Sequence, residues 1–155
     1  MPTFFVIFEH MSKFKLRIQT DLGFEFWADV PGFEGLYQAS TYGRIKSLEK
    51  RVKSGENRTI LYRERIKQPR KLKEGYLKVQ IWKDGISYEK FVHRLIAETF
   101  LPVFNTDFKE INHKSEVKSE NQVWNLEWCN HKYNITYGTG MKRRKEARRR
   151  KKESD

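Results

Sequence analysis

Apolar and polar residues alternate strictly from residue 75 to residue 82, and this period of two predicts a β-strand. Its apolar face carries Leu77, Val79 and Ile81. Asp84 and Gly85 follow as a pair typical of two-residue hairpin turns, whose backbone needs positive φ angles. We therefore expect the chain to return over residues 86–92 as the second strand of a hairpin. The opposite, polar face of this hairpin is expected to carry Lys78, Gln80 and Lys90.

The pattern changes to a helical period at residue 93. A short helix is predicted over His93–Phe100, with Leu95 and Ile96 facing the core and Leu101–Pro102 ending it. Residues 108–138 then predict the order strand, polar loop, strand and helix. The expected bounds are a strand ending at Asn112–His113, a loop over 114–123, a strand including Leu126–Trp128, and a helix over 130–137 stopped by Gly138.

The first part of the chain is less regular. Residues 24–48 hold short aromatic pieces separated by three glycines and one proline, which is typical of small strands and tight turns. Residues 49–74 are polar and basic without a clear period, and we expect a loop there with a marginal strand at 59–62. Residues 1–23 form an extension whose apolar stretch at 4–8 is either a small strand or poorly ordered. Together these patterns predict the α+β class.

Composition limits the possibilities further. A chain of 155 residues with 37% apolar residues can form one modest core. No apolar run approaches the roughly 18 residues of a membrane-spanning helix, so no membrane partner is expected. The single cysteine, Cys129, excludes a disulfide framework and a paired-cysteine zinc site.

The net charge of +12 indicates a polyanionic partner, and nucleic acid comes first. Residues 141–155 hold nine basic residues against three acidic ones, and therefore carry half of this charge. Such a block is usually a disordered or transiently helical arm. An arm that contacts phosphates is preferred here over a merely solubilising tail, because the rest of the chain is basic too. The long polar side chains of the hairpin could likewise enter a major groove, or simply face solvent.

Histidine and asparagine supply the candidate chemistry. His113 can act as a general base near neutral pH, and amide oxygens can hold one divalent ion against a phosphate. Asn112 and Asn134 are the candidate ligands, although neighbours on a strand point to opposite faces, so Asn112 and His113 need a bend to act together. Asn125 is expected to hydrogen-bond the loop backbone, and so to hold or orient His113.

Other side chains are weaker candidates. His113, Cys129 and His131 together suggest zinc, but they lack the paired spacing of zinc ligands. His93, at the start of a helix, is expected to cap or pack.

Two sets of residues carry a resemblance to a known family. Residues 27–48, with Trp27, Asp29–Tyr37, Gly43–Arg44 and Lys46–Leu48, resemble the NUMOD-type DNA-binding motif. Residues 75–138, with Val92–Ala97, Asn112–Lys114, Asn125–Trp128 and Asn134, resemble the HNH nuclease domain that follows this motif in homing endonucleases of bacteriophages. The resemblance covers about two thirds of the chain. It divides the chain into an extension (1–23), a DNA-binding motif (24–48), a basic linker (49–74), an HNH domain (75–138) and a basic tail (139–155).

The resemblance implies a ββα-metal site and a metal-dependent endonuclease that cuts duplex DNA, in the nicking homing type. His113 would be the general base, with Asn125 assisting it, and Asn112 and Asn134 would hold a single Mg²⁺ or Mn²⁺ with no small-molecule cofactor. The expected DNA-contacting residues are Arg44, Lys46, Lys78, Gln80, Lys90, Lys114, Lys142, Arg143 and Arg144. A monomer acting in the cytoplasm of a bacterial host is expected.

Two departures from the family motivate an alternative. The family often has Asp where this chain has Asn112, and the loop after Lys114 lacks the usual turn glycine. A DNA-binding protein with a degenerate, inactive nuclease domain is therefore the alternative. A basic RNA-binding protein is a third possibility, because the basic tail alone does not exclude it.

Overall fold

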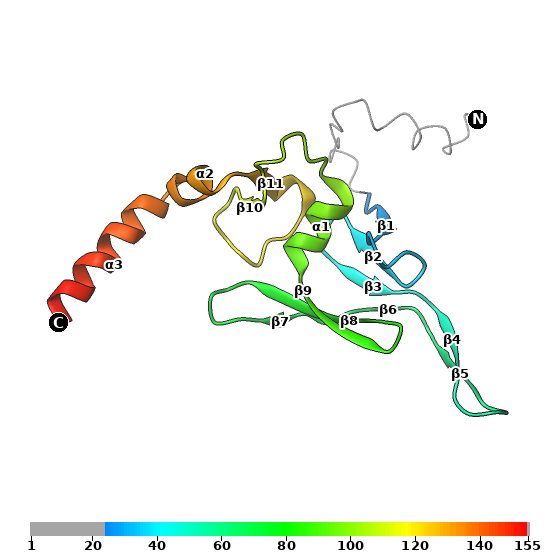
Figure 1. Ribbon diagram of the computed structural model, residues 1–155. Helices are drawn as coiled ribbons and strands as arrows, with labels where there is room; N and C mark the ends of the chain where they lie inside the picture. The colour runs from blue at the N-terminus through cyan, green and yellow to red at the C-terminus, as the bar shows by residue number, and fades with distance from the viewer. Residues whose placement is uncertain (1–23, 155) are drawn as a thin grey trace, which may run out of the picture.

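The computed structural model describes residues 24–154, and Figure 1 traces their strands and helices. The apolar stretch at 4–8 lies outside the described residues. The architecture mixes small antiparallel sheets with three α-helices, which confirms the expected α+β class. No helix among the described residues is long and apolar enough to cross a membrane.

The N-terminal sheet has the strand order β1-β2-β3-β6 and is antiparallel throughout. Its strands are β1 (Trp27–Asp29), β2 (Tyr37–Ser40), β3 (Ile45–Ser47) and β6 (Arg65–Ile66). The inward side chains Val30, Ala39 and Ile45 are almost wholly buried. The turn-rich sequence of this region thus builds a small sheet, as its glycines predicted.

The expected loop over 49–74 is wrong for most of its length. Strands β4 (Lys50–Lys53) and β5 (Thr59–Tyr62) form a hairpin that extends away from the body, and only β5 was expected. β6 then joins the N-terminal sheet, and β7 (Arg70–Lys71) pairs with the next sheet. These strands lack an apolar alternation because both faces of the hairpin are largely exposed, so the periodicity of buried strands is missing.

The predicted hairpin forms the second sheet, of order β7-β8-β9. β8 (Leu77–Lys83) and β9 (Ile86–Phe91) are joined by Asp84 and Gly85, whose φ angles are 51° and 78°. The expected inward residues Val79 and Ile81 are 2% and 0% exposed.

Lys90 was assigned to the wrong face of this hairpin. It lies directly opposite Val79 in the antiparallel register, and residues so paired project from the same side of a sheet. Its ammonium group lies 5.8 Å from the centre of the Tyr88 ring, on that side. The two-residue turn fixes this register, which the sequence pattern of β9 did not reveal.

Helix α1 (Val92–Phe100) follows β9 directly and occupies the centre of the fold, as Figure 1 shows. Leu95, Ile96 and Ala97 are at most 2% exposed and join one core with residues of both sheets and of the last unit. The predicted helix and its inward residues are confirmed. One continuous core therefore connects the N-terminal sheet to the residues that follow α1.

The last unit has the expected order of strand, loop, strand and helix. β10 (Glu110–His113) pairs antiparallel with β11 (Leu126–Cys129), and the 3-10 turn η2 (Val123–Asn125) precedes β11. Helix α2 (His131–Thr136) is capped by the Asn130 side chain, which accepts from the Tyr133 amide at 2.8 Å. Gly138, at φ 50°, ends this segment as expected.

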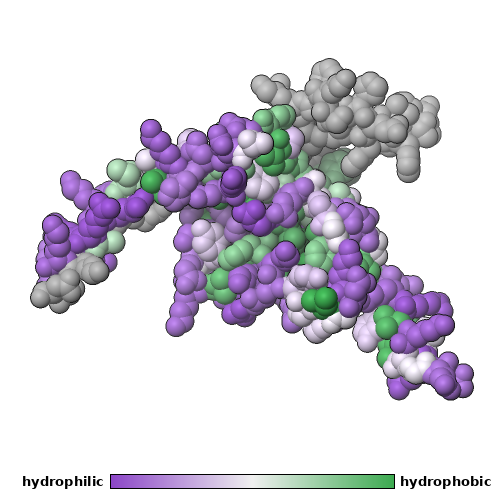
Figure 2. All heavy atoms as spheres, viewed as in Figure 1, coloured by the Kyte–Doolittle hydropathy of each residue, from purple (hydrophilic) through white to green (hydrophobic). Residues whose placement is uncertain are grey.

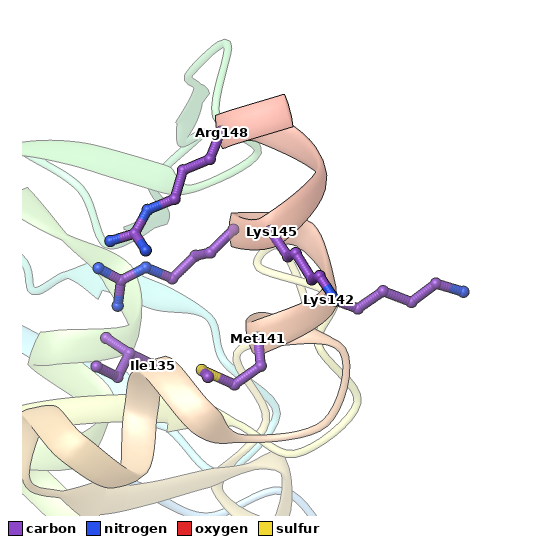
Figure 3. A pocket seen from close by; sticks show the side chains of 6 residues that line it. Ile135, Met141, Lys142, Lys145 and Arg148 are labelled. Carbon is purple, nitrogen blue, oxygen red and sulfur yellow. The ribbon is translucent and has the colours of Figure 1, made fainter. Parts of the chain in front are cut away.

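The basic tail forms a helix, α3 (Gly140–Ser154), which is one of the two forms expected for it. It projects from the body in Figure 1, and Figure 2 shows that its surface is almost wholly hydrophilic. At its start a hollow of about 630 Å³ lies against α2. Figure 3 shows the residues that line it: Ile135, Met141, Lys142, Arg144, Lys145 and Arg148.

Candidate active site

The β10–β11 ladder brings the candidate residues together. Ile111 lies opposite Trp128, Asn112 opposite Glu127, and His113 opposite Leu126. Asn112 and His113 are 6% and 5% exposed, yet both line one pocket of about 200 Å³. Asn112 and His113 are neighbours on β10, and both can line one pocket because the pocket lies at the end of that strand. The pocket is lined by Tyr76, Ile111, Asn112, His113, Glu116, Lys118, Asn134 and Tyr137.

The imidazole of His113 is oriented by Asn121. The Nε2 atom of His113 lies 3.1 Å from Oδ1 of Asn121. The amide nitrogen of Asn121 donates in turn to the carbonyl of Ser119 at 3.2 Å, which directs Oδ1 toward the ring. An amide oxygen only accepts hydrogen bonds, so the proton of a neutral imidazole resides on Nε2. The Nδ1 lone pair of His113 has no donor among the described residues.

Burial lowers the pKa of His113, and the nearby ammonium group of Lys118 lowers it further. The hydrogen bond to Asn121 and the carboxylate of Glu120 act in the opposite direction and do not outweigh burial. The ring is therefore uncharged at neutral pH, which is the state that a general base needs.

Asn125 holds the loop and not the imidazole. Its side chain accepts from the Ser115 amide at 2.9 Å and donates to the Glu120 carbonyl at 2.7 Å. Its carbonyl accepts from the Lys114 amide at 2.8 Å. The expectation that Asn125 bonds the loop backbone is confirmed, but the direct contact with His113 belongs to Asn121. The sequence showed Asn121 only as one polar residue of the loop over 114–123 and gave no signal of its burial.

The loop after Lys114 lacks the usual turn glycine, and Glu116 takes the positive φ angle in its place. Glu116 itself takes a positive φ of 61°, and its carboxylate accepts from the Thr139 amide at 2.7 Å. This bond joins the loop to the segment between α2 and α3. The loop is thus anchored by its own glutamate.

The two candidate metal ligands each donate to a carboxylate. Nδ2 of Asn112 lies 2.7 Å from Glu127, and Nδ2 of Asn134 lies 2.6 Å from Glu110. No described residue donates to the Oδ1 atom of either asparagine. The carboxylate of Glu110 has a lowered pKa because Asn134 and then His131 donate to it. Glu110 is therefore an anionic acceptor at neutral pH.

This donor set fits a hard divalent cation. Mg²⁺ takes oxygen ligands, keeps several waters, and needs few groups from the protein. The pocket offers two amide oxygens, Oδ1 of Asn112 and of Asn134, without competing donors. The zinc alternative fails, since His131 bonds Glu110 at 2.7 Å and no group of three His, Cys, Asp or Glu suited to a metal occurs among residues 24–154. Burial instead raises the pKa of the Cys129 thiol to about 11.

A second histidine lies against the first. The ring centre of His93 is 5.2 Å from that of His113, and Tyr76 and Phe91 complete the aromatic cluster. Burial lowers the pKa of His93 to about 3, so this ring stays neutral. Its Nδ1 atom is buried without a hydrogen-bond partner in the described structure. His93 thus packs beside the site, as its position at a helix start suggested.

The N-terminal sheet reaches the same loop. The Val123 amide donates to the Thr41 carbonyl at 3.0 Å, and the Tyr42 and Trp124 rings meet edge to face at 5.1 Å. A Cβ atom built on Gly43 would lie 2.8 Å from the backbone of Asn121. The turn at 41–43 therefore packs directly against the residue that orients His113.

The expected DNA-contacting residues lie in the N-terminal sheet region, the β8–β9 hairpin, the loop after β10 and helix α3. Arg44 and Lys46 flank the Trp27 ring and pair with Glu25 and Glu64. Lys78 pairs with Glu89, and Gln80 donates to Ser87. Lys114 donates to the Trp124 carbonyl near the pocket.

The tail residues Lys142 and Arg144 are exposed on α3, and the side chain of Arg143 lies outside the described part. Lys118, in the pocket, was not anticipated; a single lysine in a polar loop carries no distinguishing sequence signal.

The chain is similar to known proteins in both its N-terminal motif and the region that follows it. The NUMOD4 motif matches residues 25–85. The chain is 31% identical over 109 residues to the DNA endonuclease I-HmuI of Bacillus phage SP01, which covers 70% of this chain and 55% of that protein. It is 34% identical over 64 residues to the uncharacterized HNH endonuclease L245 of Acanthamoeba polyphaga mimivirus, covering 41% of this chain and 19% of that protein.

A solved structure, described as DNA binding and cleavage by the HNH homing endonuclease I-HmuI, matches with a TM-score of 0.56 and 30% identity. The match covers 71% of this chain and 55% of that one. The chain therefore spans about half the length of I-HmuI. Sequence and fold agree in this comparison: the chain combines a NUMOD4 motif with a region homologous to the phage HNH homing endonuclease I-HmuI.

Proposed function

We propose that the protein is a metal-dependent endonuclease that hydrolyses phosphodiester bonds in duplex DNA by nicking. The observation that carries the proposal is the imidazole of His113, 3.1 Å from Asn121, in one pocket with the side chains of Asn112 and Asn134. The similarity to a named DNA endonuclease supports DNA as the substrate.

His113 acts as the general base. With its proton on Nε2, it accepts a proton at Nδ1 from the water that attacks the phosphorus. Asn121 holds the ring in this tautomer while the charge on the imidazole develops. Lys118, which lines the pocket, is placed to contact a phosphate oxygen of the substrate.

Asn112 and Asn134 would hold one Mg²⁺ or Mn²⁺ ion through their Oδ1 atoms. The bound ion would stabilise negative charge on the phosphoryl group and on the leaving oxygen. Two neutral amides bind such an ion weakly, so the DNA phosphate would provide much of the affinity. Asn125 contributes by keeping the loop closed around His113.

DNA would lie across the basic surfaces. We propose phosphate or groove contacts for the N-terminal motif, the hairpin, the loop after β10 and the tail: Arg44, Lys46, Lys78, Gln80, Lys90, Lys114, Lys142, Arg143 and Arg144. Lys90 contributes from the other face of the hairpin than Lys78. We further propose that the protein acts as a monomer in the cytoplasm of a bacterial host.

Incubation of supercoiled plasmid and phage DNA with Mg²⁺ or Mn²⁺ tests the proposal. The parent protein should give open circles, and His113→Ala should lower the rate by about 10²- to 10⁴-fold, the usual contribution of a general base. Duplex DNA binding by His113→Ala, measured by a gel shift, should match that of the parent. A His113→Ala protein that nicks at the parent rate would disprove the assignment of the base.

A DNA-binding protein with an inactive nuclease domain is the second candidate. The neutral side chain at Asn112 favours it, because a carboxylate there would hold a cation more strongly. Salt-sensitive binding to duplex DNA with no cutting in any divalent ion would support this candidate. Equal binding to RNA in the same assay would instead favour an RNA-binding protein.

A further inference from the structure

Each of the two candidate metal ligands, Asn112 and Asn134, donates a hydrogen bond to a glutamate. On β10 and β11, residues 110, 112 and 127 project from the same side of the ladder. Asn112 donates to Glu127, which also accepts from the Tyr133 hydroxyl at 3.1 Å. Asn134 donates to Glu110, which also bonds His131 Nδ1 at 2.7 Å. Each asparagine thus donates to a carboxylate that also bonds another side chain of helix α2.

We infer that Glu127 and Glu110 are positioning residues that aim the Oδ1 atoms of Asn112 and Asn134 at the metal. The inference rests on the proposed function. A carboxylate only accepts hydrogen bonds, so it fixes which end of the neighbouring amide faces it. The NH₂ group must turn toward the glutamate, and the oxygen must turn away from it. Neither oxygen has a donor among the described residues, and both asparagines line the pocket.

The same contacts compensate for the missing charge at position 112. A hydrogen bond to an anionic acceptor is shorter and stronger than one to a neutral group, and it polarises the amide toward a more negative oxygen. The family often has a carboxylate at position 112. This chain has a neutral amide there, hydrogen-bonded to the carboxylate of Glu127. An aspartate at position 112 would instead face the carboxylate of Glu127 directly across the ladder, and like charges there are destabilising.

A metal-free measurement tests the contacts first. In the ¹⁵N-labelled protein without metal or DNA, Glu127→Gln should shift the side-chain NH₂ signals of Asn112 and leave those of Asn134 in place. Glu110→Gln should do the reverse. Glu98→Gln, which removes an exposed carboxylate from α1, serves as the control and should move neither. Signals that stay in place in both variants would overturn the inference, whether or not the protein cuts DNA.

Mn²⁺ binding then tests the role. Mn²⁺ is titrated into the DNA-free protein, and the free ion is followed by electron paramagnetic resonance. Glu127→Gln should weaken binding by about tenfold, the lower end for residues that orient metal ligands. In an Asn112→Asp background the same change should strengthen binding, because the introduced amide can donate to the new carboxylate and the repulsion between the two carboxylates disappears.

The effect of Glu127→Gln on Mn²⁺ affinity should therefore have opposite signs in the parent and in the Asn112→Asp background. Equal weakening in both backgrounds would show that Glu127 acts by direct ligation or long-range charge, and would overturn the positioning role. Unchanged Mn²⁺ affinity in Glu127→Gln would overturn it as well. The proposed function fails separately, if His113→Ala cuts DNA at the parent rate or if the parent does not cut at all.

Discussion

The Nε2 atom of His113 lies 3.1 Å from the Oδ1 atom of Asn121, eight residues along the chain in the loop between β10 and β11. This contact places the proton of the neutral imidazole on Nε2, and no described residue donates to Nδ1. The functional state of His113 therefore depends on a side chain that does not line the pocket itself.

Replacement of Asn121 tests this dependence. Asn121→Ala removes the acceptor for Nε2–H, and the rate of plasmid nicking should fall by about 10- to 100-fold, as is usual when a residue that orients a catalytic group is removed. Asn121→Asp keeps an acceptor and should retain more activity than Asn121→Ala. Equal losses in the two variants would indicate that loop packing, and not the hydrogen bond, is what matters.

The pH dependence of nicking should reflect the burial of His113. Burial lowers its pKa below the ordinary value of 6.5, so the base remains unprotonated at mildly acid pH. The acid limb of kcat/KM, which reports groups of the free enzyme, should therefore fall below pH 6.5. In Asn121→Asp the added negative charge should raise the pKa of His113 and move this limb to higher pH. An acid limb in the parent above pH 6.5 would contradict the buried, neutral base.

Stability should fall with acid pH through His93. Its pKa is about 3 in the folded protein against an ordinary 6.5, so the unfolded chain binds the proton more readily. The contribution is complete above pH 6.5 and is lost as the pH falls toward 3, with a slope of at most about 1.4 kcal/mol per pH unit. Unfolding in urea at pH 6.5 and pH 4.5 should show a smaller decrease for His93→Phe than for the parent.

The comparison with His93→Phe isolates one group. His113 also has a lowered pKa and contributes in the same direction, but it does so in both proteins. The Nδ1 atom of His93 has no hydrogen-bond partner in the described structure, so a phenyl ring removes no such bond there. Equal decreases in the parent and in His93→Phe would show that other groups dominate the acid limb.

Gly43→Ala should impair nicking although Gly43 lies in the N-terminal sheet region. The backbone there has a φ of 82°, and a Cβ atom would lie 2.8 Å from the Asn121 backbone. Strain and displacement should lower the free energy of unfolding by about 1–3 kcal/mol. Gly55→Ala, at a φ of 86° with open space around it, is the matched control: it shares the backbone strain and should leave nicking unchanged. A reduction in nicking in both variants would point to stability alone.

The basic helix α3 should govern the salt dependence of DNA binding. Removal of residues 140–155 takes away a net charge of six, because the segment holds nine basic and three acidic residues. Duplex affinity should fall, and the slope of log affinity against log salt should become shallower by up to roughly 0.9 for each phosphate that the truncated protein no longer neutralises. Measurement at several salt concentrations by fluorescence anisotropy checks this. An unchanged slope would mean that α3 does not bind phosphates.

Regular periodicity made part of the fold predictable. The β8–β9 hairpin, α1 and the strand, loop, strand and helix order of the last unit were anticipated because each buries one face. Of the strands in residues 49–74, only β5 was anticipated. The β4–β5 hairpin is largely exposed and so lacks an apolar alternation, and β6 and β7 are two-residue strands that pair with β3 and β8. The face of Lys90 follows from the register that the two-residue turn at Asp84–Gly85 sets, and the expectation did not carry that register through β9.

The sequence predicted three residues that the structure brings to one pocket: Asn112, His113 and Asn134. It did not predict the hydrogen bonds of Asn121 and the two glutamates, because these depend on which side chains the ladder and the loop bring within 3.1 Å. From sequence alone, the neutral residue at position 112 indicated a weaker metal site and motivated the inactive alternative. In the structure Asn112 lies opposite Glu127 and donates to its carboxylate.

The contact between the turn at 41–43 and the loop at 121–124 also limits how freely the N-terminal motif can be exchanged. A change of target site by exchange of the N-terminal motif would replace the surface against which Asn121 packs, so binding preference and cutting rate would change together. Chimeras that join a foreign motif to this β10–β11 unit should regain speed when Thr41, Tyr42 and Gly43 are carried over as well. Residues on the two sides of this boundary therefore have to be exchanged together.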